Sequence, residues 1–246
     1  MPDHGRTADQ FLAGNLDQFP QFTNDSLPKF NVKTLKKCLY PVDINGDHLP
    51  DLIFSGYSGG ESDLVRIYLN HGNSFELVFE DYQYISEFRK EAGKLVELQT
   101  GDVGSGSNYL YFTHEYRVSH ENGRPVFIMV KQKVAYRYTE EPSKFYQKPV
   151  SFVAKADTML LRSSAAQLNE PFIPELGTFG NIVAKYRSKA RGVVLAMKSY
   201  GKGNDWYYVE VFPGTSPSAS ILYDVSRMPA FVHGWVSGQS ILRDVK

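Results

Sequence analysis

The stretch DINGDHLPDLIF, residues 43–54, joins an oxygen-rich loop directly to an apolar strand. Three carboxylates crowded into one short loop repel each other unless a cation lies among them. Calcium suits such a loop, because it takes six to eight oxygen ligands in a flexible shell. The sequence therefore predicts a calcium site. Its side-chain oxygens stand at the first, third, fifth and ninth places of the loop: Asp43, Asn45, Asp47 and Asp51.

Neighbouring residues narrow the kind of site that the loop can form. A backbone carbonyl near Leu49 can add a further oxygen, but an EF-hand loop requires glutamate at the twelfth place, where this chain has Phe54. Zinc is disfavoured, because His48 is the sole nitrogen ligand nearby. A metal-free turn, in which the aspartates accept hydrogen bonds from their own backbone, is the alternative.

The loop pattern resembles the VCBS/FG-GAP class of repeat, whose loop runs Asp-x-Asn-Gly-Asp-Gly-x-x-Asp-Leu. The segment RIYLNHGNSF, residues 66–75, resembles the second strand and turn of that repeat. The family usually has glycine, at positive φ, where this chain has His48, and this departure predicts weaker calcium affinity. The resemblance implies five calcium ligands, the last through its carbonyl: Asp43, Asn45, Asp47, Asp51 and Leu49.

Composition and charge limit the classes of partner. The 246 residues include 27 basic and 27 acidic side chains, so the net charge of +0 predicts no binding to nucleic acid. No apolar run is long enough to span a membrane. The single cysteine, Cys38, forms no disulfide within the chain, and the KKCLY context favours a buried thiol. An aromatic content of 14% favours β-structure.

The first part of the chain predicts one helix and a series of strands. Residues 7–19 have the apolar periodicity of an amphipathic helix. From about residue 39 to 140, apolar runs alternate with turn signals such as Asn122-Gly123, which predicts an antiparallel meander. The expected strands cover residues 51–56, 64–70, 74–80, 94–100, 108–118 and 125–138.

The segment EEPSKFYQKP, residues 140–149, predicts a junction between a domain of residues 1–145 and one of residues 146–246. The motifs LLRSS, KARG, DWYYVEV and HGWVSGQSI in the second part resemble a bacterial Src-homology-3-like (SH3b) domain. The resemblance implies a small β-barrel with two long loops, residues 165–180 and 213–230, flanking a ligand groove. The expected strands cover residues 151–156, 158–164, 181–188, 192–200, 205–212 and 231–238.

Aromatic residues of the second part supply candidate ligand contacts. Trp206 and Tyr208 share one face of an alternating strand, where they can stack on a peptide or glycan or close the core. Trp235 has the same two interpretations, with packing favoured. Arg162 is a further candidate, although an anchoring role toward a turn or a carboxylate is favoured for it.

The predicted protein is mainly β: an antiparallel meander with an N-terminal helix, followed by a small SH3-like barrel. It carries no recognisable catalytic motif. These features predict a non-enzymatic, calcium-stabilised, monomeric bacterial binding module that recognises peptidoglycan, a peptide or an envelope protein. The alternative is an interaction or inhibitor protein of the immunity type that occludes a partner, and a cell-wall hydrolase is the least favoured class.

The predicted location follows from the calcium loop. Millimolar calcium outside the cytoplasm can fill a weak site, whereas cytosolic calcium cannot. We therefore expect an extracytoplasmic protein: periplasmic, secreted or surface-anchored. The residues after Met1 do not read as a signal peptide, so this location implies that a leader was removed, and a cytoplasmic location stays open.

Overall fold

The computed structural model describes residues 4–23, 31–60, 62–103, 110–155, 157–173, 178–201, 203–215, 217–220 and 230–243. The chain forms two compact units, one of residues 1–106 and 113–130 and the other of residues 107–112 and 131–246. Strand β8 (Arg124–Tyr136) begins in the first unit and ends in the second. This boundary precedes the junction at residues 145 and 146 that the sequence indicates.

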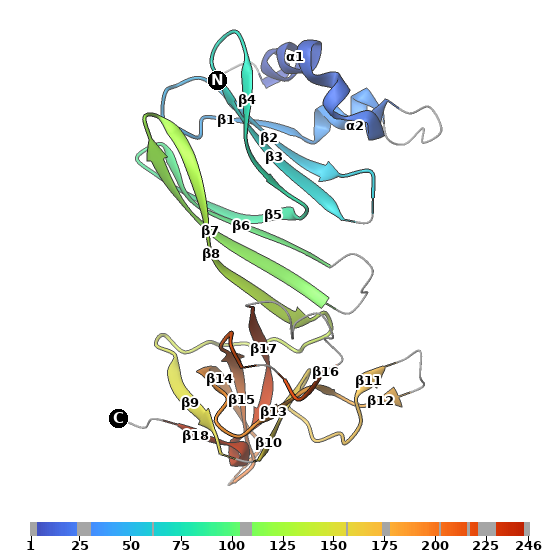
Figure 1. Ribbon diagram of the computed structural model, residues 1–246, viewed down its shortest axis with the longest axis vertical. Coiled ribbons are helices and arrows are strands. Elements are labelled where there is room, and N and C mark those ends of the chain that lie inside the picture. Colours follow the sequence, from blue (N-terminus) through green and yellow to red (C-terminus); the bar gives the residue numbers. More distant parts are fainter. Residues whose placement is uncertain are drawn as a thin grey trace. The chain divides into compact units, whose positions relative to one another are not determined.

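The first unit combines helical segments with antiparallel strands (Figure 1). The expected helix over residues 7–19 corresponds to α1 and the following 3-10 turn. Strands β1 to β4 form one sheet in chain order, and β5 to β8 are neighbours in chain order in a second sheet. The helical segments are α1 (His4–Asn15), η1 (Leu16–Gln18), η2 (Pro20–Phe22) and α2 (Val32–Lys37). The strands before β8 are β1 (Leu39–Val42), β2 (Asp51–Tyr57), β3 (Asp63–Asn70), β4 (Phe75–Asp81), β5 (Tyr84–Glu91), β6 (Lys94–Val103) and β7 (Leu110–Glu121).

Two apolar cores cover the two faces of the β1–β4 sheet. On one face, Phe19, between η1 and η2, packs against Phe54 of β2, and Phe11 of α1 packs against Tyr68 of β3. On the other face, Ile53 of β2 belongs to a core shared with Leu98 of β6. Because successive side chains of a strand point to opposite faces, a strand between two cores must be apolar throughout. The continuous LIF run therefore lies in the middle layer of the unit, between α1 and α2 and the β5–β8 sheet (Figure 1).

The second unit consists of further, mostly antiparallel strands. β18, β9, β14, β15, β17 and β8 are neighbours in that order, and β10 pairs with both β17 and β13. The pairing of β17 with β8 is parallel. The strands are β9 (Val150–Ala154), β10 (Thr158–Arg162), β11 (Phe172–Ile173), β12 (Thr178–Phe179), β13 (Ile182–Arg187), β14 (Arg191–Ser199), β15 (Asp205–Val211), β16 (Ala219–Ser220), β17 (Phe231–Ser237) and β18 (Ile241–Arg243), with a 3-10 turn, η5 (Gly238–Ser240), before β18.

The structure confirms the predicted mainly-β fold with an N-terminal helix and antiparallel sheets. The pairings found over the described ranges leave the second unit's sheet open, so the small SH3-like barrel is not confirmed. Residues 174–177, 216 and 221–229 of the two long loops lie outside the described residues.

The sequence did not predict β5, which carries mostly exposed side chains. Its segment YISEFRKE lacks the apolar alternation by which a half-buried strand is recognised. Helix α2 was also missed, because it spans only Val32–Lys37. The Asn31 side chain caps it by accepting a hydrogen bond from the Thr34 amide.

Candidate functional site

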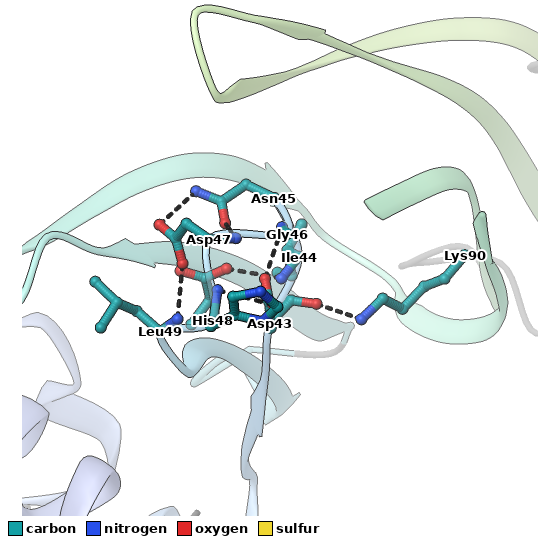
Figure 2. Close-up of polar contacts among 9 residues, drawn as sticks. Asp43, Ile44, Asn45, Gly46, Asp47, His48, Leu49 and Lys90 are labelled. Atoms are coloured by element: carbon teal, nitrogen blue, oxygen red, sulfur yellow. Dashed lines mark hydrogen bonds and ion pairs between the residues drawn. The ribbon is translucent and has the colours of Figure 1, made fainter. Parts of the chain in front are cut away.

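The predicted calcium loop connects β1 to β2 (Figure 2). Two of its residues have positive φ, Gly46 at 80° and His48 at 70°. His48 therefore adopts the left-handed conformation that glycine adopts at this place in the VCBS/FG-GAP pattern. Histidine can adopt this conformation, but at a cost that glycine does not have.

The polar side chains of the loop bind its own backbone (Figure 2). The Asp43 carboxylate accepts hydrogen bonds from the amides of Gly46, at 2.7 Å, and His48, at 3.2 Å. Asn45 Oδ1 accepts from the Asp47 amide at 3.1 Å, and Asp47 Oδ1 accepts from the Leu49 amide at 2.8 Å. These are Asx-turn contacts, which hold the loop in its tight path.

Asp51 differs from the other acidic residues of the loop, because it is fully buried. Its Oδ2 accepts a hydrogen bond from the Ile44 amide and its Oδ1 accepts one from the Asn70 amide, both at 2.8 Å. Burial raises the pKa of Asp51 to about 6, although the two amide hydrogen bonds act in the opposite direction. Asp51 thus ties the loop to the end of β3 from inside the unit.

Positive charge lies next to the loop. The Lys90 ammonium donates a hydrogen bond to the Asp43 carbonyl (Figure 2), and His48 Nδ1 lies 3.9 Å from Asp43 Oδ2. The side chain of Lys94 packs against Gly46, where an added Cβ would lie 3.2 Å from it. The charges of the two lysines, Lys90 and Lys94, offset part of the charge of the three aspartates.

The donor chemistry of the loop fits calcium, since every candidate ligand is oxygen. Within the described ranges, no three histidine, cysteine or acidic side chains lie close enough together to hold an ion. The carboxylate oxygens have lone pairs beyond those that accept the amide hydrogen bonds. Asp43 and Asp47 could therefore turn toward an ion without losing every loop contact.

A groove of about 570 Å³ lies beside the loop in the first unit. Asn45 and Asp47 line it, and both are predicted calcium ligands. Glu76, on the groove wall, pairs with His71 at 3.0 Å and with Arg124 at 2.9 Å. Any ion in the loop would therefore change the charge of the groove.

The four residues predicted to bind a ligand in the second unit are all buried. The exposed fractions are 5% for Trp206, 3% for Tyr208, 1% for Trp235 and 4% for Arg162. The structure brings them together, with the Tyr208 and Trp235 rings 5.4 Å apart and the Arg162 guanidinium 5.9 Å from the Trp206 ring. We call these four residues the aromatic cluster.

Two parts of the chain cover the aromatic cluster, one around Glu140 and Phe145 and the other around Leu168 and Asn181. Trp235 Nε1 donates a hydrogen bond to the Glu140 carbonyl at 2.6 Å, and the Phe145 ring lies 6.0 Å from that of Tyr208. Arg162 Nη1 donates to Asn181 Oδ1 at 2.7 Å and to the Leu168 carbonyl. In this conformation the cluster packs the interior, and ligand binding by it stays a prediction that requires the covering segments to move.

Two buried contacts between a histidine and a carboxylate were not predicted. In the first unit, Asp81 Oδ2 accepts hydrogen bonds from Thr100 at 2.6 Å, Tyr116 at 2.9 Å and His114 at 3.0 Å. Burial acts to raise the pKa of Asp81, but these hydrogen bonds outweigh it and lower the pKa. Asp81 and His114 come from β4 and β7, so no local spacing could indicate the pair.

The second contact lies in the second unit at Glu210, which is 5% exposed. Its Oε2 contacts Lys131 Nζ at 2.6 Å and His233 Nε2 at 2.8 Å. Burial acts to raise the pKa of Glu210, but the two partners lower it. The sequence carried one signal here, because Glu210 shares a strand face with Trp206 and Tyr208.

Comparisons of the chain with models of protein families, with curated proteins and with solved structures found no match. Over the residues that the structure describes, no helix has the length and apolar character needed to cross a membrane.

Proposed function

We propose that this protein is a non-enzymatic, extracytoplasmic binding module whose first unit is stabilised by calcium. The observation that carries the proposal is the loop between β1 and β2, in which Asp43, Asn45 and Asp47 are held in Asx turns above the buried Asp51. An ion bound there would join the loop to β2 and β3. It would relieve the repulsion among the three carboxylates.

The groove beside the loop is the proposed ligand surface. It is lined by acidic and amide side chains together with Arg124, so it suits a ligand rich in hydrogen-bonding groups. Peptidoglycan, a peptide or an envelope protein has this chemistry. Because Asn45 and Asp47 belong to both loop and groove, ligand binding should depend on calcium.

The expected size of the calcium effect follows from linkage. With a dissociation constant on the order of 0.1 mM and about 1 mM calcium, the first unit gains about 1.4 kcal/mol. This corresponds to a rise in melting temperature of roughly 3–6 °C. Cytosolic calcium is too dilute to produce the rise, so calcium stabilisation of this size requires an extracytoplasmic location.

Thermal unfolding in calcium, magnesium or chelator tests this proposal. The natural chain should melt at a higher temperature in calcium alone, and Asp47→Ala should lose the rise. Asp17→Ala removes an exposed carboxylate of the same unit outside the loop and should retain it. Identical melting of the natural chain in all three conditions would make the loop a metal-free turn.

An interaction or inhibitor protein is the second candidate. The burial of the aromatic cluster favours it, because a covered groove leaves only outer surfaces for a partner. Co-sedimentation with purified peptidoglycan separates a wall-binding module, which sediments, from an occluding protein, which stays in solution. Release of soluble fragments in the same tube would indicate the cell-wall hydrolase instead.

A further inference from the structure

A further cavity lies in the second unit, and all its wall residues belong to that unit. It has a volume of about 220 Å³, and its walls include Tyr136 and Tyr208, which are 1% and 3% exposed. Pockets for drug-sized ligands measure about 300–1,000 Å³, so this cavity suits a smaller group. Its buried aromatic walls provide an apolar floor.

Two opposite charges line the same cavity. Arg137 and Glu141 are both exposed residues on its wall. The Arg137 guanidinium lies 5.8 Å from the Tyr138 ring, which helps to hold it in place. The Glu141 carboxylate is close enough to Tyr208 to raise the pKa of that phenol, after burial, which has the larger effect. Glu141 therefore lies near the aromatic floor.

Neither charge is neutralised by the protein. Over the described part of the chain, Arg137 and Glu141 have no ion-pair partner, and they are not paired with each other. Thr139, between them in the sequence, also lines the cavity, and its buried Oγ1 has no hydrogen-bond partner there. A buried hydroxyl without a partner is costly, so a polar group of a bound molecule that reaches Thr139 Oγ1 would gain a hydrogen bond there.

We propose that this cavity binds the zwitterionic end of an α-amino acid, with its ammonium at Glu141 and its carboxylate at Arg137. The two unpaired charges match the two charges of such a group. Small apolar substituents can lie on Tyr136 and Tyr208. The ligand is either a free amino acid or the free α-amino-carboxylate end of a diamino acid in a wall peptide, which has the same chemistry.

This inference goes beyond the proposed calcium-dependent function, because no wall residue of the cavity belongs to the loop or its groove. Binding should therefore persist in chelator. Calorimetric titration of the full chain in chelator isolates the cavity from the calcium site. If the loop binds no calcium, amino-acid binding by the cavity is unaffected. If the cavity binds no amino acid, the calcium proposal is likewise unaffected.

The probes are alanine, alanine methyl ester, N-acetylalanine and a tripeptide that ends in diaminopimelate. Alanine should bind saturably, and each capped derivative should bind about tenfold more weakly or worse, since each lacks one charge-assisted contact. A tripeptide that binds more tightly than alanine identifies a wall peptide as the source. Tighter binding of alanine than of the tripeptide identifies a free amino acid as the ligand.

Matched variants test the assignment of the two charges. Arg137→Gln and Glu141→Gln should each weaken alanine binding about tenfold or more, and both sites are exposed, so folding should be retained. Glu170→Gln, at another exposed site of the same unit, should bind as the natural chain does. No binding of alanine or the tripeptide, equal binding of the capped derivatives, or unchanged binding by the two variants would overturn the proposal.

Discussion

The loop between β1 and β2 and the aromatic cluster of the second unit satisfy their polar groups in opposite ways. In the loop, Asp43 and Asp47 accept hydrogen bonds from amides two to five residues away. In the cluster, Trp235 donates to a carbonyl 95 residues away. Local contacts therefore make a site detectable from spacing, whereas long-range contacts can bury the same kind of residue without any local signal.

The largest expected effect concerns the cluster. If Trp235 packs the interior, Trp235→Ala should destabilise the second unit by about 3–5 kcal/mol, because it leaves a cavity and an unpaired Glu140 carbonyl. Denaturant unfolding followed by the fluorescence of Trp206 measures this loss, since both tryptophans lie in the second unit. Met197→Ala, at a side chain 46% exposed, is the control and should cost far less. A loss below about 1 kcal/mol for Trp235→Ala would mean that the cluster is not core.

The next effect concerns the buried anchor of the loop. Asp51→Ala should cost about 3 kcal/mol, because the amides of Ile44 and Asn70 both lose their acceptor in a buried place. Asp51→Asn retains one acceptor oxygen and should cost about half as much. Hydrogen exchange at these two amides should accelerate in both variants. Unchanged exchange would show that Asp51 does not hold the loop.

The two buried histidine–carboxylate contacts give each unit one carboxylate whose stabilising effect depends on pH. The pKa of Asp81 and that of Glu210 are both lowered in the folded chain, so their stabilisation is present above the unfolded pKa values of about 4 and is lost as the pH falls through the folded values. Asp81→Asn should cost about 1–2 kcal/mol at neutral pH and flatten the loss of stability below about pH 4.

Glu210→Gln is the matching variant in the second unit, and it should reduce the loss of that unit's stability below about pH 4. Stability measured by denaturant at several pH values checks both variants. If the stability of a variant falls with acidic pH as steeply as that of the natural chain, the role given to that carboxylate is contradicted.

The smallest effect concerns the exposed part of the loop. In chelator, Asp47→Asn should change stability by less than about 0.5 kcal/mol, because the side chain is exposed and its contacts are local. The calorimetric melting temperature in chelator measures it. A larger loss would mean that Asp47 supports the fold itself, and the contrast between loop and cluster would then weaken.

Much of the fold could be predicted because its cause is local. The continuous apolar LIF run, the aromatic-rich run DWYYVEV and the Asn122-Gly123 turn each depend on neighbours in the chain, and all lie where strands or a hairpin were expected. The edge strand β5 escaped prediction, because its exposed, charged sequence carries no packing signal. The missed helix α2 is only six residues long.

The candidate sites also differ in whether the sequence reveals them. The oxygen-rich loop is visible in the sequence, because nine consecutive residues supply every predicted ligand. The cavity of Arg137, Glu141 and Tyr208 is not, because strand β15 reaches it from about 70 residues later in the chain. Alternation placed Trp206 and Tyr208 on one face, but it could not say what covers that face.

The sequence by itself determined the mainly-β class, most of the strands, and the loop with its oxygen-bearing side chains, because these depend on spacing within a few residues. Only the tertiary structure decided that the aromatic cluster is buried and that Asp51 anchors the loop from inside. It also decided that Asp81 meets His114 and that two opposite charges share a cavity. Those outcomes depend on which distant strands pack together, and hydrophobic burial is non-directional, so no short pattern encodes them.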